Sequence, residues 1–158
     1  MRFILSRLLR PLLLKGLVNQ MLKILILDDA KVIRALLKLT LESDGIVCDE
    51  AATVDEALQY AQQNEYDLMI IDYMLEDGHN GLELVEAIKS KGKNIETPCI
   101  MLSAEDGETC KSNAKDLGVK AWLKKPFTPT GMLKVVYKVL KIDYKNRNIN
   151  KHSMHHHE

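Results

Sequence analysis

The chain has 158 residues, 46% of them apolar and 28% charged, and its 22 basic side chains balance 22 acidic ones. This composition is ordinary for one globular domain with a single hydrophobic core. The three cysteines, Cys48, Cys99 and Cys110, are odd in number and share no metal-ligand spacing. They argue against a disulfide framework and against a zinc site, and they fit a reducing, cytoplasmic compartment.

The first twenty residues form a distinct segment, because they carry four basic side chains and no acid. Basic residues and Pro11 interrupt their apolar run before it reaches the roughly 18 residues that span a bilayer. We interpret residues 1–20 as a basic apolar leader, or as upstream sequence read through before a natural start at Met21, and favour the second. An amphipathic segment on a membrane surface is the alternative. The remaining 18 basic and 22 acidic residues give no electrostatic reason to expect nucleic-acid binding.

A domain is predicted over residues 21–142, followed by a disordered polar tail over residues 143–158. Within the domain the hydrophobic period switches repeatedly between two and 3.6, which predicts alternating strands and helices. Five such units favour an α/β fold with a parallel sheet covered by helices on both faces. The predicted strands are 22–28, 46–51, 66–72, 98–104 and 119–123.

The helices between these strands carry recognisable start and stop signals. Gly45 is expected to end the first helix, and Thr53 with Glu56 forms a capping box that opens the second. Thr128 caps the last helix, with Pro129 at its first position. Two further helices are predicted at 81–90 and 105–116. We expect the last helix to bury Met132, Leu133, Val136, Val139 and Leu140.

Polar side chains stand where the predicted strands end, and such groups converge in one crevice of a parallel sheet. They are Asp28, Asp29, Asp72, Ser103 and Lys125. Three close carboxylates raise one another's pKa unless a cation is present, and an all-oxygen cluster suits Mg²⁺. With the metal and a lysine neutralising the transferring oxygens, a carboxylate can attack a phosphoryl group and form an acyl phosphate.

These residues resemble the bacterial response-regulator receiver domain over about Lys23 to Leu140. The resemblance depends on "DD", "LMIIDYML", "MLSA" and "KKPF", which stand in the family's order. It implies a doubly wound, flavodoxin-like three-layer fold with strand order 2-1-3-4-5. By resemblance, Asp72 is the phosphoacceptor. Lys125 contacts the phosphoryl group and precedes Pro126 in what is typically a cis peptide bond.

The resemblance also implies a metal site and a switch. Asp28, Asp29, Asp72 and the backbone carbonyl of Met74 would hold Mg²⁺. Ser103 would be the switch hydroxyl, and Trp122 the aromatic side chain that rearranges on activation. Taken alone, Ser103 would be an ordinary helix cap, a role that can coexist with the switch, and Trp122 would more often be a simple packing residue.

The implied function is that of a single-domain response regulator, phosphorylated on Asp72 by a sensor histidine kinase or a phosphotransfer protein. It would catalyse its own phosphorylation and dephosphorylation but turn over no external substrate. Too few residues follow the last helix for an output domain, so we expect signalling by contact. The target would bind the face made by the fourth helix, fifth strand and fifth helix. No membrane partner is expected, and the chain would be a monomer or weak dimer.

The stretch "AWLKKPFTP" is similar to stand-alone receivers of the chemotaxis type, and a phosphorelay intermediate or a non-phosphorylated binding module are alternatives. Two other classes fit less well. A phosphohydrolase of the haloacid dehalogenase type would carry D-x-D after the first strand, where this chain has adjacent Asp28 and Asp29. A flavodoxin-like FMN carrier would have a glycine-rich phosphate loop there.

The chain departs from the family's pattern after the phosphoacceptor. Many receivers have proline at the position of Glu76, and the loop before Gly81 is one residue longer here. The extra carboxylate leaves open whether Mg²⁺ binding is tighter or weaker. Met74 and Glu105 occupy positions that influence dephosphorylation in the family. We hypothesise that Met74 favours a long-lived acyl phosphate, because it cannot orient an attacking water by a strong hydrogen bond.

Overall fold

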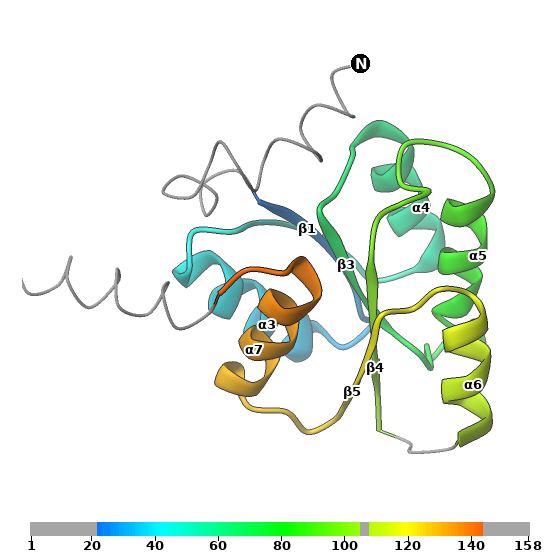
Figure 1. The fold of residues 1–158 in the computed structure, drawn as a ribbon. Coiled ribbons are helices and arrows are strands. Elements are labelled where there is room, and N and C mark those ends of the chain that lie inside the picture. The colour runs from blue at the N-terminus through cyan, green and yellow to red at the C-terminus, as the bar shows by residue number, and fades with distance from the viewer. Residues whose placement is uncertain (1–21, 105–107, 144–158) are drawn as a thin grey trace, which may run out of the picture.

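The computed structural model describes residues 22–104 and 108–143, drawn in colour in Figure 1. The leader over residues 1–20, Met21, Glu105 and nearly all of the predicted tail lie outside these ranges. The expectations for them therefore stay predictions. Within the described ranges, no helix is both long enough and apolar enough to cross a bilayer.

In the part of the chain that the structure describes, five strands alternate with five helices, as predicted. The strands are β1 (Lys23–Leu27), β2 (Val47–Ala51), β3 (Leu68–Asp72), β4 (Cys99–Ser103) and β5 (Ala121–Lys124). The helices are α3 (Lys31–Ser43), α4 (Val54–Gln63), α5 (Leu82–Ser90), α6 (Glu108–Asp116) and α7 (Pro129–Leu140). All strand pairs are parallel and their order is β2-β1-β3-β4-β5, which confirms the predicted doubly wound fold.

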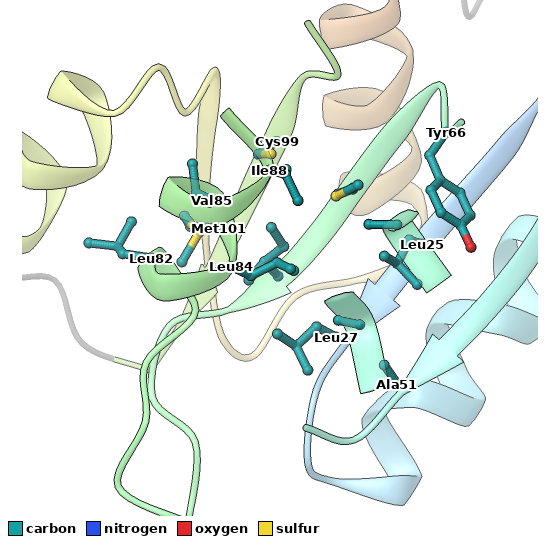
Figure 2. Packing of buried hydrophobic residues seen from close by; sticks show 14 of the residues in the cluster. Leu25, Leu27, Ala51, Tyr66, Leu82, Leu84, Val85, Ile88, Cys99 and Met101 are labelled. Atoms are coloured by element: carbon teal, nitrogen blue, oxygen red, sulfur yellow. The ribbon is translucent and has the colours of Figure 1, made fainter. Parts of the chain in front are cut away.

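The helices form a layer on each face of the sheet. Helices α3 and α7 pack on one face, and α4, α5 and α6 on the other (Figure 1). Alternate residues of the central strands enter the two cores, so that Leu25 lies in one and Ile24 and Ile26 in the other. Figure 2 shows the first core, where Val85 and Ile88 of α5 lie against the sheet.

The predicted helix signals have the expected local structure. The Thr53 hydroxyl accepts a hydrogen bond from the Glu56 backbone N–H at 3.2 Å, and the Thr128 hydroxyl accepts one from Gly131 at 2.9 Å. Gly45 follows α3 with φ of +81°, a conformation that glycine adopts at little cost. The two threonine caps fix where α4 and α7 begin, and Gly45 marks where α3 ends.

The prediction for the buried face of the last helix was partly wrong. Val139 and Leu140 are only half-buried, whereas Tyr137 is fully buried between α7 and α3. Its hydroxyl donates a hydrogen bond to Asp44 at 2.6 Å. A tyrosine can enter the core here because its polar end reaches a carboxylate at the end of α3.

Candidate functional site

The predicted site residues lie where the central strands end. Asp28 directly follows β1, while Asp72 and Ser103 are the last residues of β3 and β4. All three side chains are buried, with exposed fractions of 0%, 4% and 2%. The parallel register sets Asp72 opposite Leu102, next to Ser103. Adjacent parallel strands thus bring polar residues that are distant in sequence together at the carboxyl ends of the strands.

Lys125 joins two of these carboxylates. Its ammonium nitrogen donates to Asp28 Oδ2 at 2.9 Å and to Asp72 Oδ1 at 3.2 Å. The Lys125 backbone N–H also donates to the Ser103 carbonyl at 2.8 Å, which holds the end of β5 against β4. The Lys125–Pro126 peptide bond is cis, as the resemblance implied. The lysine predicted to face inward therefore does so.

Asp28, Asp29 and Asp72 form a cluster of three carboxylates. Each offers an oxygen, and the three oxygens lie within 4.8 Å of one another. Asp28 and Asp72 are buried, while Asp29 is half-buried. Oxygen donors of this charge are what Mg²⁺ prefers, and a half-open site leaves room for the waters that the ion keeps. The donor set therefore fits a single Mg²⁺.

The environment of Asp72 disfavours its charge. Burial, followed by the neighbouring carboxylate of Asp28, raises the pKa of Asp72 to about 6, although Lys125 opposes the shift. The pKa of Lys125 is also raised. Burial alone would lower that pKa, but the Asp28 and Asp72 carboxylates outweigh it. Above about pH 6 the site thus holds ionised Asp72 beside a charged lysine.

The loop that follows β3 folds back as a small hairpin. Met74 pairs with Asn80 in an antiparallel bridge, flanked by hydrogen bonds from Leu75 N–H to the His79 carbonyl and from Gly81 N–H to the Tyr73 carbonyl. In this pattern the backbone groups of Met74 point away from Asn80. The Met74 carbonyl therefore points outward from the hairpin, on the side where a ligand can reach it.

Gly81 fixes the distance between this hairpin and the site. A Cβ at that position would overlap the Asp72 carbonyl oxygen and the Ile71 side chain. Gly81 has φ of −64°, so glycine is needed for the close approach and not for an unusual backbone conformation. The absence of a side chain lets α5 begin directly against the end of β3.

The two predicted switch residues occupy different surroundings. Ser103 is buried at the end of β4, and Trp122 on β5 packs against Tyr73, with ring centroids 5.5 Å apart and planes at 49°. Within the described residues, the buried Trp122 Nε1 has no hydrogen-bond acceptor. His79, in the loop after β3, is exposed, and its Nδ1 lies 3.1 Å from the Glu83 carboxylate.

Sequence reasoning missed several contacts that hold the site. Arg34 Nη1 donates to the Asp28 carbonyl at 2.6 Å, and the Ala30 N–H donates to Asp28 Oδ1 at 2.8 Å. The Glu76 N–H donates to Asp29 Oδ2 at 2.5 Å. An aspartate two residues before the backbone N–H that donates to its side chain is a known turn signal, so the Ala30 contact could have been found. No local sequence pattern predicts the contacts of Arg34 and Glu76.

Comparison with known proteins gives a consistent result. The family model described as "Response regulator receiver domain" matches residues 24–137. The transcriptional regulatory protein ResD of Bacillus subtilis is 36% identical over 107 residues, which cover 68% of this chain and 43% of ResD. The phosphate regulon regulator PhoB of Pseudomonas aeruginosa is 32% identical over 118 residues, which cover 75% and 51%. The chain spans about half the length of these relatives.

Solved structures share the fold as well. The chemotaxis protein CheY4 of Vibrio cholerae superimposes with a TM-score of 0.72 at 34% identity, covering 75% of this chain and 98% of CheY4. The receiver domain of the Francisella response regulator 1452 gives a TM-score of 0.67 at 33% identity, covering 75% and 96%.

Proposed function

Because the chain belongs to the response-regulator receiver family, we propose that it accepts a phosphoryl group onto Asp72 from a sensor histidine kinase or a phosphotransfer protein. Phosphorylation on aspartate and Mg²⁺ binding in an acidic pocket are general in this family. The observation that carries the proposal is the contact of the Lys125 ammonium with both Asp28 and Asp72. It sets a cation beside the one buried carboxylate that ends β3.

In the proposed reaction, an ionised Asp72 oxygen attacks phosphorus. The new P–O bond forms as the bond to the donor breaks, and a phosphohistidine donor leaves as imidazole. The Lys125 ammonium neutralises negative charge on the transferring oxygens, and Asp28 keeps that ammonium charged and in place. A raised pKa near 6 still leaves Asp72 mostly ionised at neutral pH.

Asp28, Asp29, Asp72 and the Met74 carbonyl would hold Mg²⁺, which when bound neutralises the phosphoryl oxygens as a Lewis acid. Two observations support this ligand set: the mutual proximity of the three carboxylate oxygens and the outward direction of the Met74 carbonyl. The chain's own contribution would be to supply four oxygen donors from two segments, residues 28–29 after β1 and residues 72–74 at the end of β3.

Signalling would follow from a two-state change of the domain. Phosphorylated Asp72 would attract the Ser103 hydroxyl, and Trp122 would repack, changing the affinity of the face built by α6, β5 and α7 for a target protein. The location of Ser103 beside Asp72 in the register supports the first step. The buried Trp122 Nε1, which lacks an acceptor among the described residues, supports the second, because a rearranged state could satisfy it.

An apolar recess next to the site offers a docking place for the phosphodonor. It is lined by Ile33, Leu36, Ala104, Lys125, Pro126 and Phe127. A donor protein seated there would lie directly beside the Lys125 ammonium. Exposed Val32, at 78% exposure on the same end of α3, would extend the apolar contact.

We further propose that the chain acts in the cytoplasm as a single-domain response regulator of the chemotaxis type, as a monomer or weak dimer. The similarity of the described domain to the chemotaxis protein CheY4, with a TM-score of 0.72 at 34% identity, supports the chemotaxis type. A phosphorelay intermediate would use the same Asp72 chemistry and is the second candidate.

Incubation with Mg²⁺ and acetyl phosphate, followed by intact-mass measurement, tests the proposal. We expect one added phosphoryl group that requires Mg²⁺ and is absent in Asp72→Asn. A folded protein that gains no phosphoryl group would instead be a receiver-like binding module.

A further inference from the structure

A backbone hydrogen bond links the hairpin after β3 to the carboxylate cluster. Glu76 N–H donates a hydrogen bond to Asp29 Oδ2 at 2.5 Å, across 47 positions of sequence. A hydrogen bond to an ionised carboxylate is stronger than one between neutral groups. It occupies one Asp29 oxygen and leaves the other available.

The hairpin presents this N–H because of its own internal structure. Leu75 is buried in the core beneath α4 and α5, and its N–H bonds across the hairpin to the His79 carbonyl. A hydrogen bond from the Gly78 N–H to the Leu75 carbonyl at 3.2 Å closes a turn in which Glu76 is the first of the two central residues. The Glu76 N–H takes no part in this turn bond or in the bond between Leu75 and His79, so it is available to Asp29.

We infer that the Glu76 backbone N–H is a positioning group for Mg²⁺: it holds Asp29 toward Asp28 and Asp72 before the metal arrives, and so tightens Mg²⁺ binding. The inference rests on the proposed function, and it concerns a residue outside the ligand set. Asp29 is the one half-buried member of the cluster, so without this bond its side chain has the most rotameric freedom to lose on binding the ion.

Whether a backbone N–H is present at position 76 depends on the residue type there. Proline has no backbone N–H and could not make the bond. Any other residue could, because the Glu76 side chain is exposed and the bond uses only the main chain. Backbone and carboxylate effects at this position are therefore separable by substitution.

The test measures the Mg²⁺ dissociation constant by NMR titration of backbone amide shifts, which also shows whether each variant is folded. Glu76→Pro removes the N–H, while Glu76→Gln and Glu76→Ala keep it and remove the carboxylate charge. We expect Glu76→Pro to weaken Mg²⁺ binding about tenfold, the size of one charge-assisted hydrogen bond. The other two variants should stay within about twofold of the unchanged protein at physiological salt, where exposed charges are screened.

Phosphorylation by acetyl phosphate gives a second readout. In Glu76→Pro the Mg²⁺ concentration for half-maximal rate should rise by the same factor, while the rate at saturating Mg²⁺ stays unchanged. A merely structural role would lower the saturating rate too. In the unchanged protein without Mg²⁺, the Glu76 amide should exchange slowly with solvent, which tests the bond without any substitution.

Equal Mg²⁺ affinity in Glu76→Pro and the unchanged protein would overturn the inference. So would a loss in Glu76→Gln or Glu76→Ala as large as in Glu76→Pro, because the carboxylate would then be responsible. A Glu76 amide that exchanges as fast as an unprotected one would also overturn it. If the unchanged protein bound no Mg²⁺ at all, the proposed function itself would fail.

Discussion

The Lys125 ammonium nitrogen lies 3.2 Å from Asp72 Oδ1, so a cation and the proposed nucleophile are in direct contact at the end of β3. The same nitrogen contacts the fully buried Asp28. One lysine thus compensates two buried carboxylates in the protein without metal, and its loss should have consequences for both stability and chemistry.

Replacing Lys125 by methionine should leave Asp28 and Asp72 without this compensation. Removing one member of a buried ion pair typically costs about 3 kcal/mol, so we expect a loss of that order in the free energy of unfolding near neutral pH. The loss should shrink at about pH 5, where Asp72 is largely protonated. Urea unfolding in EDTA measures both values. Lys124→Met, at the exposed neighbouring position, is the matched control and should change little; equal losses in the two variants would contradict the assignment.

The pH dependence of stability should show Asp72 directly. Its pKa is raised from 3.8 to about 6 in the folded protein, so folding favours the protonated form. Asp72 therefore lowers the free energy of unfolding by nothing well below pH 3.8. The loss grows as the pH rises and Asp72 ionises, and it is complete above about pH 6. Asp72→Asn should accordingly raise the free energy of unfolding by up to about 3 kcal/mol near pH 7.5, and by only about 1 kcal/mol near pH 4.5.

Urea unfolding of both proteins in EDTA across this pH range makes the comparison. Asparagine keeps an oxygen that can accept from Lys125, so the substitution removes charge without removing the contact. A gain in stability that did not vary with pH would show that the charge of Asp72 is not its source.

Replacing Gly81 by alanine should displace the end of β3, which carries Asp72. The new Cβ would overlap the Asp72 carbonyl oxygen and the Ile71 side chain, both of which belong to the central strand. We expect a loss of about 2 kcal/mol in unfolding free energy, typical of overpacking, together with slower phosphorylation. Gly78→Ala in the same hairpin meets no atom within 4 Å and bears only the cost of its positive φ. It should leave the phosphorylation rate unchanged; a similar slowing in both would contradict the packing argument.

Met74→Asn tests whether the side chain at this position sets the lifetime of the acyl phosphate. Met74 is 58% exposed on the outer edge of the hairpin, and its thioether binds water weakly. An asparagine amide could orient an attacking water, so we expect dephosphorylation to be about tenfold faster, equivalent to one hydrogen bond in the transition state. The decay of phosphoprotein after removal of the donor gives the rate. Met74→Leu keeps the backbone carbonyl and should decay like the unchanged protein, and an unaltered half-life in Met74→Asn would refute the hypothesis.

Much of the fold was predictable because the two signals that specify it, apolar runs for the strands and capping residues for the helices, are local. The buried runs of β1, β3 and β4 are apolar on both faces, and Thr53 and Thr128 cap helices in the way their neighbours predict. Parallel strands then require crossover helices, which leaves few topologies. The strand order came from the resemblance, since no local pattern distinguishes it.

The convergence of Asp72 and Lys125 was predictable because both stand where predicted strands end. Contacts made by the backbone were not predictable. The Glu76 N–H is the same in nineteen residue types, and its contact with Asp29 depends on how the hairpin closes over the sheet. The burial of Tyr137 was missed for a related reason: its hydroxyl is acceptable in the core only because Asp44, distant in sequence, lies beside it.

The most direct test of the central claim locates the phosphoryl group. Borohydride reduces an acyl phosphate to an alcohol, so a phosphorylated aspartate becomes homoserine, which peptide mass spectrometry can assign to one position. After treatment with acetyl phosphate and Mg²⁺, we expect homoserine at position 72 alone, and none when Mg²⁺ is removed by EDTA. Homoserine at position 28 or 29, or an unmodified position 72 in folded protein, would contradict the assignment of Asp72 as the phosphoacceptor.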